Sequence, residues 1–416
     1  MVVVFVLVAV AVLSLLGVLH WYVWRRVVRD TTVSGSVARR VGRVVMAGLP
    51  LLTVATFVGE NAGVPFGLVQ VIAWPGYLWL AVFLYLLLAL AAGELVRPLL
   101  RGKYGKLEKE VPRRVRVPEL VTVPETDVPE PPVEDPGPVT AEDPSRRLFV
   151  SRVVAGTAAA VALGTVGYGT YGTLRGPKVK RLTVPLAKLP RGAHGFRIAV
   201  VSDVHLGPIL GRDFAQRVVD TVNATQPDLI AVVGDLVDGN VDDLEPAVAP
   251  LAGLRARHGA FFVTGNHEYI SGAEQWVEHV QELGLRLLAN ERVEVQGFDL
   301  AGVNDLHADE GEGPDFARAL GDRDRTRAAV LLAHQPAAVH EAVRHGVDLQ
   351  LSGHTHGGQL WPFNFVAGLA NPTLAGLERH EDTQLYVTRG AGAWGPPVRV
   401  GAPSDITVIE LASRQA

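Results

Sequence analysis

The stretch Leu229-Ile230-Ala231-Val232-Val233-Gly234-Asp235-Leu236-Val237-Asp238 joins five apolar residues to a glycine and then to a carboxylate. A short apolar run rich in β-branched residues is typical of a strand buried on both faces. Glycine after such a strand lets the backbone turn sharply. We therefore expect Asp235 at the end of a buried strand, where its two oxygens could bridge two ions.

Four further segments follow the same rule, in which an apolar run expected to form a strand ends near Asp, Asn or His. Asp203 and His205 follow Arg197–Ser202, Asn266 follows Ala260–Thr264, His334 ends Ala329–Ala333, and His354 and His356 follow Leu349–Ser352. Ligands of open α/β sheets gather beyond the carboxyl ends of the strands, so these side chains should converge. Histidine is otherwise sparse, since the first 175 residues contain only His20.

Helical patterns alternate with these strands. The clearest are Phe214–Asn223, Glu245–Arg257, Ala273–Leu283 and Pro336–Arg344. Such alternation predicts a layered α/β domain, which we assign to residues 177–416. The chain has no cysteine, so any metal must be held by nitrogen and oxygen. Ligands of this kind suit Mn, Fe or Zn, and the sequence does not choose among them.

The order and the residues of the five segments resemble the motifs of the calcineurin-like metallophosphoesterase family. G-D-x-x-D begins at Gly234, G-N-H-E at Gly265 and G-H-T-H at Gly353, and the resemblance runs from about His194 to Glu410. The G-H-T-H-G-G-Q ending, with an apolar N-terminus, is similar to the bacterial membrane-associated branch, often described as phosphodiesterases. The resemblance implies a four-layer α/β/β/α sandwich with two β-sheets.

The resemblance also implies a role for each site residue. One metal would be held by Asp203, His205, Asp235 and His356, and the other by Asp235, Asn266, His334 and His354. His267 would be the general acid, with Asp238 orienting its imidazole. Two ions about 3.5–4 Å apart can clamp a phosphoryl group and supply a hydroxide for in-line attack. This implies an enzyme, a dinuclear metallophosphoesterase in which His267 protonates the departing alkoxide.

One departure from the family bears on the substrate. Protein phosphatases of this fold continue G-D-x-x-D with Arg-Gly, whereas Asp238 is followed by Gly239 and Asn240. This favours a phosphodiester or pyrophosphate over a phosphoprotein. Arg389 and Arg399 either contact the phosphate instead or are surface residues.

Four aromatic residues lie close in sequence to the motif ends. They either form an apolar approach for a lipid or nucleoside group or simply pack; they are Trp361, Phe363, Phe365 and Trp394.

Residues 1–100 form a transmembrane region of three expected helices, Val2–Val23, Val44–Val58 and Phe66–Leu95. A bilayer span needs about 20 apolar residues. Pro75 and Gly76 suggest a kink in the third. A fourth span, Val153–Tyr171, lies within residues 149–172. The alternative for all four is a set of buried helices in a soluble core.

Basic residues orient these spans. Arginines crowd the first connection, while the second, around Glu60 and Asn61, has neither Lys nor Arg. Cytoplasmic connections carry the basic residues. Residues 101–148 are a Pro-rich acidic linker, expected to be extended and cytoplasmic. We therefore expect a multi-pass cell-membrane protein with an extracytoplasmic catalytic domain.

Ser145-Arg146-Arg147-Leu148-Phe149-Val150 precedes the fourth span. It resembles a twin-arginine signal, which would make the twin-arginine export machinery a partner. The alternative is a plain cytoplasmic anchor, and both give the same topology.

The expected partners are the lipid bilayer and a phosphoester substrate, lipid-linked or from the cell envelope. A net charge of −4 gives no basis for nucleic-acid binding. The alternatives are a non-catalytic metal-binding sensor or scaffold, a phosphomonoesterase, or a transporter regulated by its phosphoesterase domain. The spans contain almost no ionisable residues, which favours an anchor over a transporter.

Overall fold

The computed structural model describes residues 2–105, 146–308 and 311–414. The Pro-rich segment from Pro112 to Pro144 lies outside them. Contacts divide the chain into two units. The first contains Met1–Ala47 and Leu84–Ala162, and the second contains Gly48–Phe83 and Leu163–Ala416.

Four helices correspond to the four expected spans, and each is long and apolar enough to cross a membrane. They are α1 (Val2–Trp24), α2 (Val37–Asn61), α3 (Phe66–Gly105) and α4 (Arg146–Leu174). Helix α2 begins seven residues before the expected span at Val44. The hydroxyl of Ser36 accepts a hydrogen bond from the backbone N–H of Arg39, which satisfies one free donor of the first turn.

Helix α3 continues through Pro75 and Gly76, where the sequence suggested a kink. Gly76 instead allows α2 to approach closely, because a Cβ there would lie 2.6 Å from the Thr56 hydroxyl. The Thr53 hydroxyl donates a hydrogen bond to the Gly76 carbonyl at 2.7 Å. These contacts join the end of α2 to the beginning of α3 inside the second unit.

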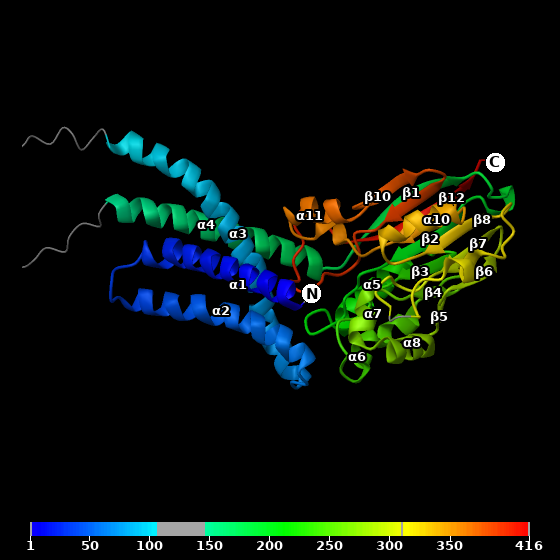
Figure 1. Ribbon diagram of the computed structural model, residues 1–416, viewed down its shortest axis with the longest axis horizontal. Helices are drawn as coiled ribbons and strands as arrows, with labels where there is room; N and C mark the ends of the chain where they lie inside the picture. Colours follow the sequence, from blue (N-terminus) through cyan, green and yellow to red (C-terminus); the bar gives the residue numbers. More distant parts are fainter. Residues whose placement is uncertain (1, 106–145, 309–310, 415–416) are drawn as a thin grey trace, which may run out of the picture. The chain divides into compact units, whose positions relative to one another are not determined.

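Two six-stranded sheets form the centre of the catalytic domain in the second unit (Figure 1). The first has the order β1 (Lys178–Leu186), β12 (Asp405–Ser413), β2 (Phe196–Val201), β3 (Leu229–Val233), β4 (Ala260–Val263), β5 (Leu285–Leu287). The second has the order β10 (Gly376–His380), β11 (Thr383–Val387), β9 (Leu349–Ser352), β8 (Ala328–Leu332), β7 (Phe298–Gly302), β6 (Glu291–Val295).

Strands β2 to β5 run parallel, and so do β7, β8, β9 and β11. Alternate residues of the two sheets share one core, as Val200 and Val233 of the first sheet cluster with Leu332 and Leu351 of the second. Most of the remaining residues of β2, β3, β4, β7, β8, β9 and β11 face outward and are also buried. This is why the strands read as continuous apolar runs.

Helices cover the outer faces of both sheets. The first sheet packs against α5 (Arg212–Ala224), α6 (Val241–Val248) and α8 (Ala273–Glu282), which Figure 1 shows beside β3 to β5. The second packs against α9 (Phe316–Leu320) and α10 (Val339–Arg344). The expected four-layer α/β/β/α sandwich is confirmed.

The helix expected over Glu245–Arg257 is placed differently. Helix α6 ends at Val248 and a 3₁₀ helix continues from Ala249 to Gly253. Pro250 lacks the N–H that an α-helix would need there, which explains the change. Helix α6 also begins earlier, because the Asn240 side chain accepts a hydrogen bond from the backbone N–H of Asp243.

Candidate metal centre

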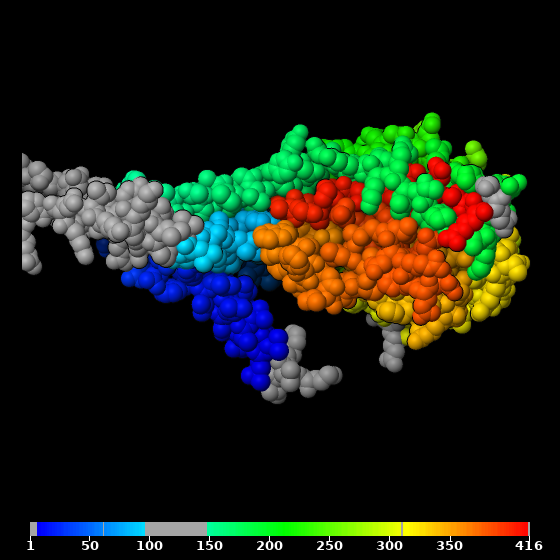
Figure 2. All heavy atoms as spheres, turned by 90° about the horizontal axis from the view of Figure 1, so that it is seen from above, coloured from blue at the N-terminus to red at the C-terminus, as the bar shows by residue number. Residues whose placement is uncertain are grey.

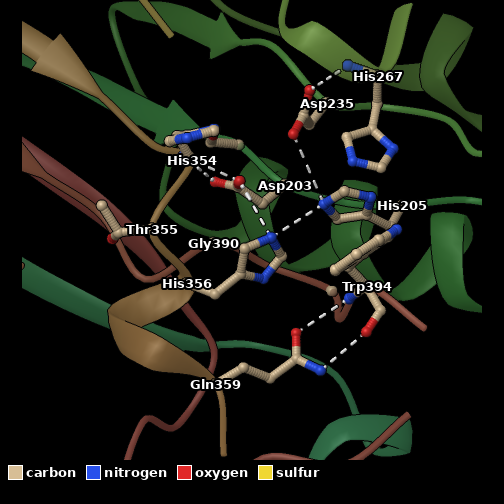
Figure 3. Close-up of polar contacts among 12 residues, drawn as sticks. Asp203, His205, Asp235, His267, His354, Thr355, His356, Gln359, Gly390 and Trp394 are labelled. Atoms are coloured by element: carbon tan, nitrogen blue, oxygen red, sulfur yellow. Dashed lines mark hydrogen bonds and ion pairs between the residues drawn. The ribbon is translucent and has the colours of Figure 1, made fainter. Parts of the chain in front are cut away.

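All seven expected ligands lie beyond the carboxyl ends of strands in the two sheets. Strands β2, β3 and β4 of the first sheet and β8 and β9 of the second each lead directly into one or two of them. Figure 3 shows Asp203, His205, Asp235, His354 and His356 directed toward a common centre. The sheets that share a hydrophobic core therefore also bring these polar groups together.

Several of these residues adopt a left-handed backbone conformation that side-chain-bearing residues seldom adopt. The φ angle is 51° at Asp203, 55° at Asp235 and 70° at His354. Such strain persists where the surrounding structure fixes it, and it concentrates at functional sites. Gly234 is required at its position, because a Cβ would lie 2.7 Å from His334 Nδ1.

The first ligand cluster contains Asp203, His205 and His356. The Nε2 atoms of His205 and His356 lie 3.0 Å apart, and His356 Nε2 lies 3.3 Å from Asp203 Oδ1. Two imidazole nitrogens and a carboxylate oxygen directed at one point form a typical site for a transition-metal ion.

The second cluster contains Asp235, His334 and His354, with Asn266 beside it. His334 Nε2 lies 3.1 Å from Asp235 Oδ2, and His354 Nδ1 lies 3.0 Å from Asn266 Oδ1. Asp235 Oδ2 is also 3.8 Å from His205 Nε2 of the first cluster. Asp235 therefore lies between the clusters, where a bridging ligand belongs.

Two of the buried imidazoles differ in protonation. Burial opposes protonation of His334, but nearby Asp235 outweighs it and raises the pKa of this imidazole well above its usual value, so the two groups form an ion pair at 3.1 Å. Burial and the nearby His334 lower the pKa of His354 to about 4, so this imidazole stays neutral with a lone pair available. Burial opposes ionisation of Asp235, but His334 outweighs it and lowers the pKa of that carboxyl. Because metal ligands bind in their deprotonated form, an ion bound here would displace the proton of His334.

Glu268 supports the centre without facing it. Its buried carboxylate accepts hydrogen bonds from the backbone N–H groups of Asp235 at 2.9 Å, Leu236 at 2.7 Å and Gly265 at 2.6 Å. No role for Glu268 was expected from the sequence. The signal was present, because an acidic residue three positions after Gly265 can bond back to the start of a helix.

Arg399 supports the first ligand cluster through His356. It is buried, its Nη2 lies 3.1 Å from His356 Nδ1, and its Nε donates to the Gly392 carbonyl. It therefore orients His356 and is neither a surface residue nor directed at a phosphate. Arg389 instead lies 3.9 Å from the carboxylate of Asp405.

The two expected catalytic residues stand at the edge of the centre. His267 Nδ1 lies 2.6 Å from Asp238 Oδ1, which also lies 2.9 Å from His205 Nδ1. Burial opposes protonation of His267, but the hydrogen bond with Asp238 outweighs it and raises the pKa to about 9. His267 is therefore protonated near neutral pH, as a general acid must be.

Comparison with known proteins agrees with this geometry. The family model described as calcineurin-like phosphoesterase matches residues 196–358. A metallophosphoesterase of Helicobacter pylori is 40% identical over 256 residues, which is 60% of this chain and 68% of that protein. The chain belongs to the calcineurin-like phosphoesterase family.

Two further relatives of this phosphoesterase bear on its architecture. A Danio rerio protein described as a transmembrane protein with a metallophosphoesterase domain is 40% identical over 259 residues, 59% of each chain. A Bacillus subtilis metallophosphoesterase is 30% identical over 285 residues, 65% of this chain and 98% of that one. Membership implies hydrolysis of phosphoesters with divalent metal ions, for which the two ligand clusters are suitable.

Proposed function

We propose that this phosphoesterase is anchored in the cell membrane and hydrolyses phosphodiester or pyrophosphate bonds of a lipid-linked or cell-envelope substrate. The observation that carries the proposal is the position of Asp235 between the two ligand clusters, with the His267–Asp238 pair beside them. This arrangement suits a dinuclear centre.

Each residue then has a distinct task. Asp203, His205, Asp235 and His356 would hold one divalent ion, and Asp235, Asn266, His334 and His354 the other, with Mn, Fe and Zn all compatible. The ions, when bound, would supply charge neutralisation for the phosphate and activation of water. His267 donates its proton to the departing oxygen, and Asp238 holds the imidazole in place for that transfer.

The loop after Asp238 favours a diester over a phosphoprotein monoester. The position occupied by arginine in protein phosphatases of this fold is Gly239, and its carbonyl accepts a hydrogen bond from Trp276 Nε1 at 2.8 Å. The next residue, Asn240, caps α6. Neither is available to bind the extra charge of a monoester.

Helix α11 (Phe363–Ala370) supports a substrate at the membrane surface. It follows the G-H-T-H-G-G-Q motif directly and has no buried residue. Phe365 is 64% exposed and Leu369 is 91% exposed. Figure 2 shows this orange segment at the molecular surface. The exposure of Phe363 and Phe365 favours an apolar approach over packing for these two residues, because exposed apolar side chains can insert into the lipid interface.

The charge distribution supports an extracytoplasmic catalytic domain. The connection between α2 and α3 has no Lys or Arg and is thus expected outside. The end of α2, the beginning of α3 and the catalytic domain belong to one unit. If the α2–α3 connection were cytoplasmic, the orientation of all four spans in the membrane would be reversed.

Activity of the full-length protein in detergent tests the proposal. With Mn²⁺ added, we expect hydrolysis of bis-p-nitrophenyl phosphate and of a lipid or envelope diester, lost in Asp235→Asn. His340→Ala, which changes an exposed histidine outside the site, is the matched control. Hydrolysis of phosphomonoesters alone would indicate a monoesterase, and metal binding without turnover of any phosphoester would indicate a sensor or scaffold.

A further inference from the structure

A pocket of about 350 Å³ opens beside the candidate metal centre, entirely within the second unit. Its walls come from the α2–α3 hairpin and, in the catalytic domain, from the loop after β3, helix α7 (Asn266–Ser271) and the loop that contains Trp394. The lining residues are Phe57, Glu60, Tyr77, Asp238, Gly239, Asn240, His267, Ile270, Ser271 and Trp394. The hairpin that anchors the protein therefore also contributes to a cavity at its active site.

The location of the pocket identifies which part of a substrate it would hold. His267 lines it, and the ring of Trp394 lies 5.7 Å from the ring of His267. A general acid must lie within hydrogen-bond reach of the oxygen that departs. The pocket therefore takes the leaving group, while the rest of the substrate extends to the other side of the phosphate.

The walls combine aromatic faces with carboxylates. The rings of Phe57 and Tyr77 meet edge to face with centroids 5.2 Å apart, and Trp394 is 51% exposed at the rim. Glu60 and Asp238 add carboxyl groups. None of the residues that line the pocket is Lys or Arg, and His267 is the basic side chain among them. Aromatic faces beside a carboxylate are the recognised environment for an organic ammonium group.

Glu60 is held in a fixed position in the pocket. The Tyr77 hydroxyl lies 2.8 Å from each of its two carboxylate oxygens and donates its single proton to the pair. Each oxygen retains further lone pairs for a ligand. Asp238 already pairs with His205 and His267. Glu60 is therefore the carboxyl group of this pocket that can bind a charged ligand.

We propose that this pocket binds the ammonium-bearing alcohol of a phosphodiester, such as the ethanolamine or choline part of a phospholipid, with Glu60 determining specificity. The inference rests on the proposed function. A water oxygen forms a new bond to phosphorus and releases a proton to the solvent. The bond from phosphorus to the alcohol oxygen breaks, and that oxygen takes the proton of His267. The products are a phosphomonoester and a free amino alcohol.

The test compares two diesters that differ mainly in the charge of the leaving alcohol. Full-length protein with Mn²⁺ is assayed on vesicles of phosphatidylethanolamine and of phosphatidylglycerol, and release of the head-group alcohol gives kcat/KM for each. We expect kcat/KM to be about tenfold higher for phosphatidylethanolamine than for phosphatidylglycerol, because one carboxylate and the aromatic faces would bind its ammonium group. Glu60→Gln should reduce the ratio to near one, and Glu410→Gln, on an exposed face of β12, should preserve it.

Trp394→Ala is the second variant, because an exposed side chain can be truncated without loss of the fold, and it should reduce the same ratio several-fold. Glycerophosphoethanolamine separates the two sources of the ammonium group: turnover comparable to that of the vesicles assigns the site to soluble diesters. A ratio unchanged in Glu60→Gln, or no preference in the wild type, would overturn the inference.

A binding measurement keeps this inference separate from the proposed function. Titration calorimetry compares phosphoethanolamine with glycerol 3-phosphate on the Mn²⁺-loaded protein and on Glu60→Gln. Tighter binding of phosphoethanolamine that depends on Glu60 supports the pocket even if no diester is hydrolysed. Equal binding of both contradicts it even if bis-p-nitrophenyl phosphate is hydrolysed.

Discussion

At the scale of single residues, His267 offers the clearest kinetic prediction. His267→Ala should lower kcat on an alkyl diester by about 10²- to 10⁴-fold, because the alkoxide leaves poorly without a proton. The loss on bis-p-nitrophenyl phosphate should be much smaller, since nitrophenolate departs without protonation. Steady-state kinetics on both substrates check this. An equal loss on both would mean that His267 does not act as the general acid.

Glu268 should matter for stability because three backbone donors depend on its carboxylate. Glu268→Ala leaves the N–H groups of Asp235, Leu236 and Gly265 buried without an acceptor. Unsatisfied buried donors cost about 1–3 kcal/mol each, so we expect a loss of at least about 3 kcal/mol. Thermal and denaturant unfolding measure this, with the exposed Glu245→Ala as control. A loss no larger than that of the control would contradict the assigned role.

The positions of the expected site residues at the ends of strands could be predicted from the sequence. Asp235 and His354 follow apolar runs whose bounds match β3 and β9. The role of Arg399 was not readable, because its burial depends on the approach of residues more than 40 positions away in sequence.

At the scale of elements, we propose that α11 inserts into the membrane surface near the metal centre. Replacing Phe365 and Leu369 by Asp should reduce hydrolysis of a bilayer substrate by about tenfold or more, since charged side chains oppose insertion into the lipid interface. Hydrolysis of soluble bis-p-nitrophenyl phosphate is the internal control. A parallel loss on both substrates would indicate damage to the site instead of to membrane docking.

The pairing of α2 with α3 could not be predicted from the sequence. Long apolar runs located the four helices, and short apolar runs located β2, β3, β4, β8 and β9. The arrangement in two sheets was implied only by the family resemblance. The closeness of α2 and α3 depends on Gly76 and on the hydroxyls of Thr53 and Thr56, which become informative only once the helices are paired. The Tyr77–Glu60 contact follows from that pairing, so the pocket was not predictable from the apolar character of the spans.

At the scale of the whole molecule, we propose that the N-terminal helices lie in the membrane and that the catalytic domain lies outside the cytoplasm. A C-terminal alkaline phosphatase fusion should be active and a C-terminal green fluorescent protein fusion, exported unfolded, should be dark. Because twin-arginine export carries folded cargo, the fluorescent fusion would glow if that route were used, while remaining accessible to external protease. Fluorescence protected from protease, with an inactive phosphatase fusion, would place the domain in the cytoplasm.

The central claim is a dinuclear metal centre bridged by Asp235, and metal stoichiometry measured together with activity tests it most directly. Purified full-length protein stripped by a chelator should be inactive on diesters, and it should regain activity as Mn²⁺ occupancy, measured by mass spectrometry, rises to two ions per chain. Asp235→Asn should lower occupancy and activity together. Full diesterase activity at one ion per chain, or in the stripped protein, would contradict the account.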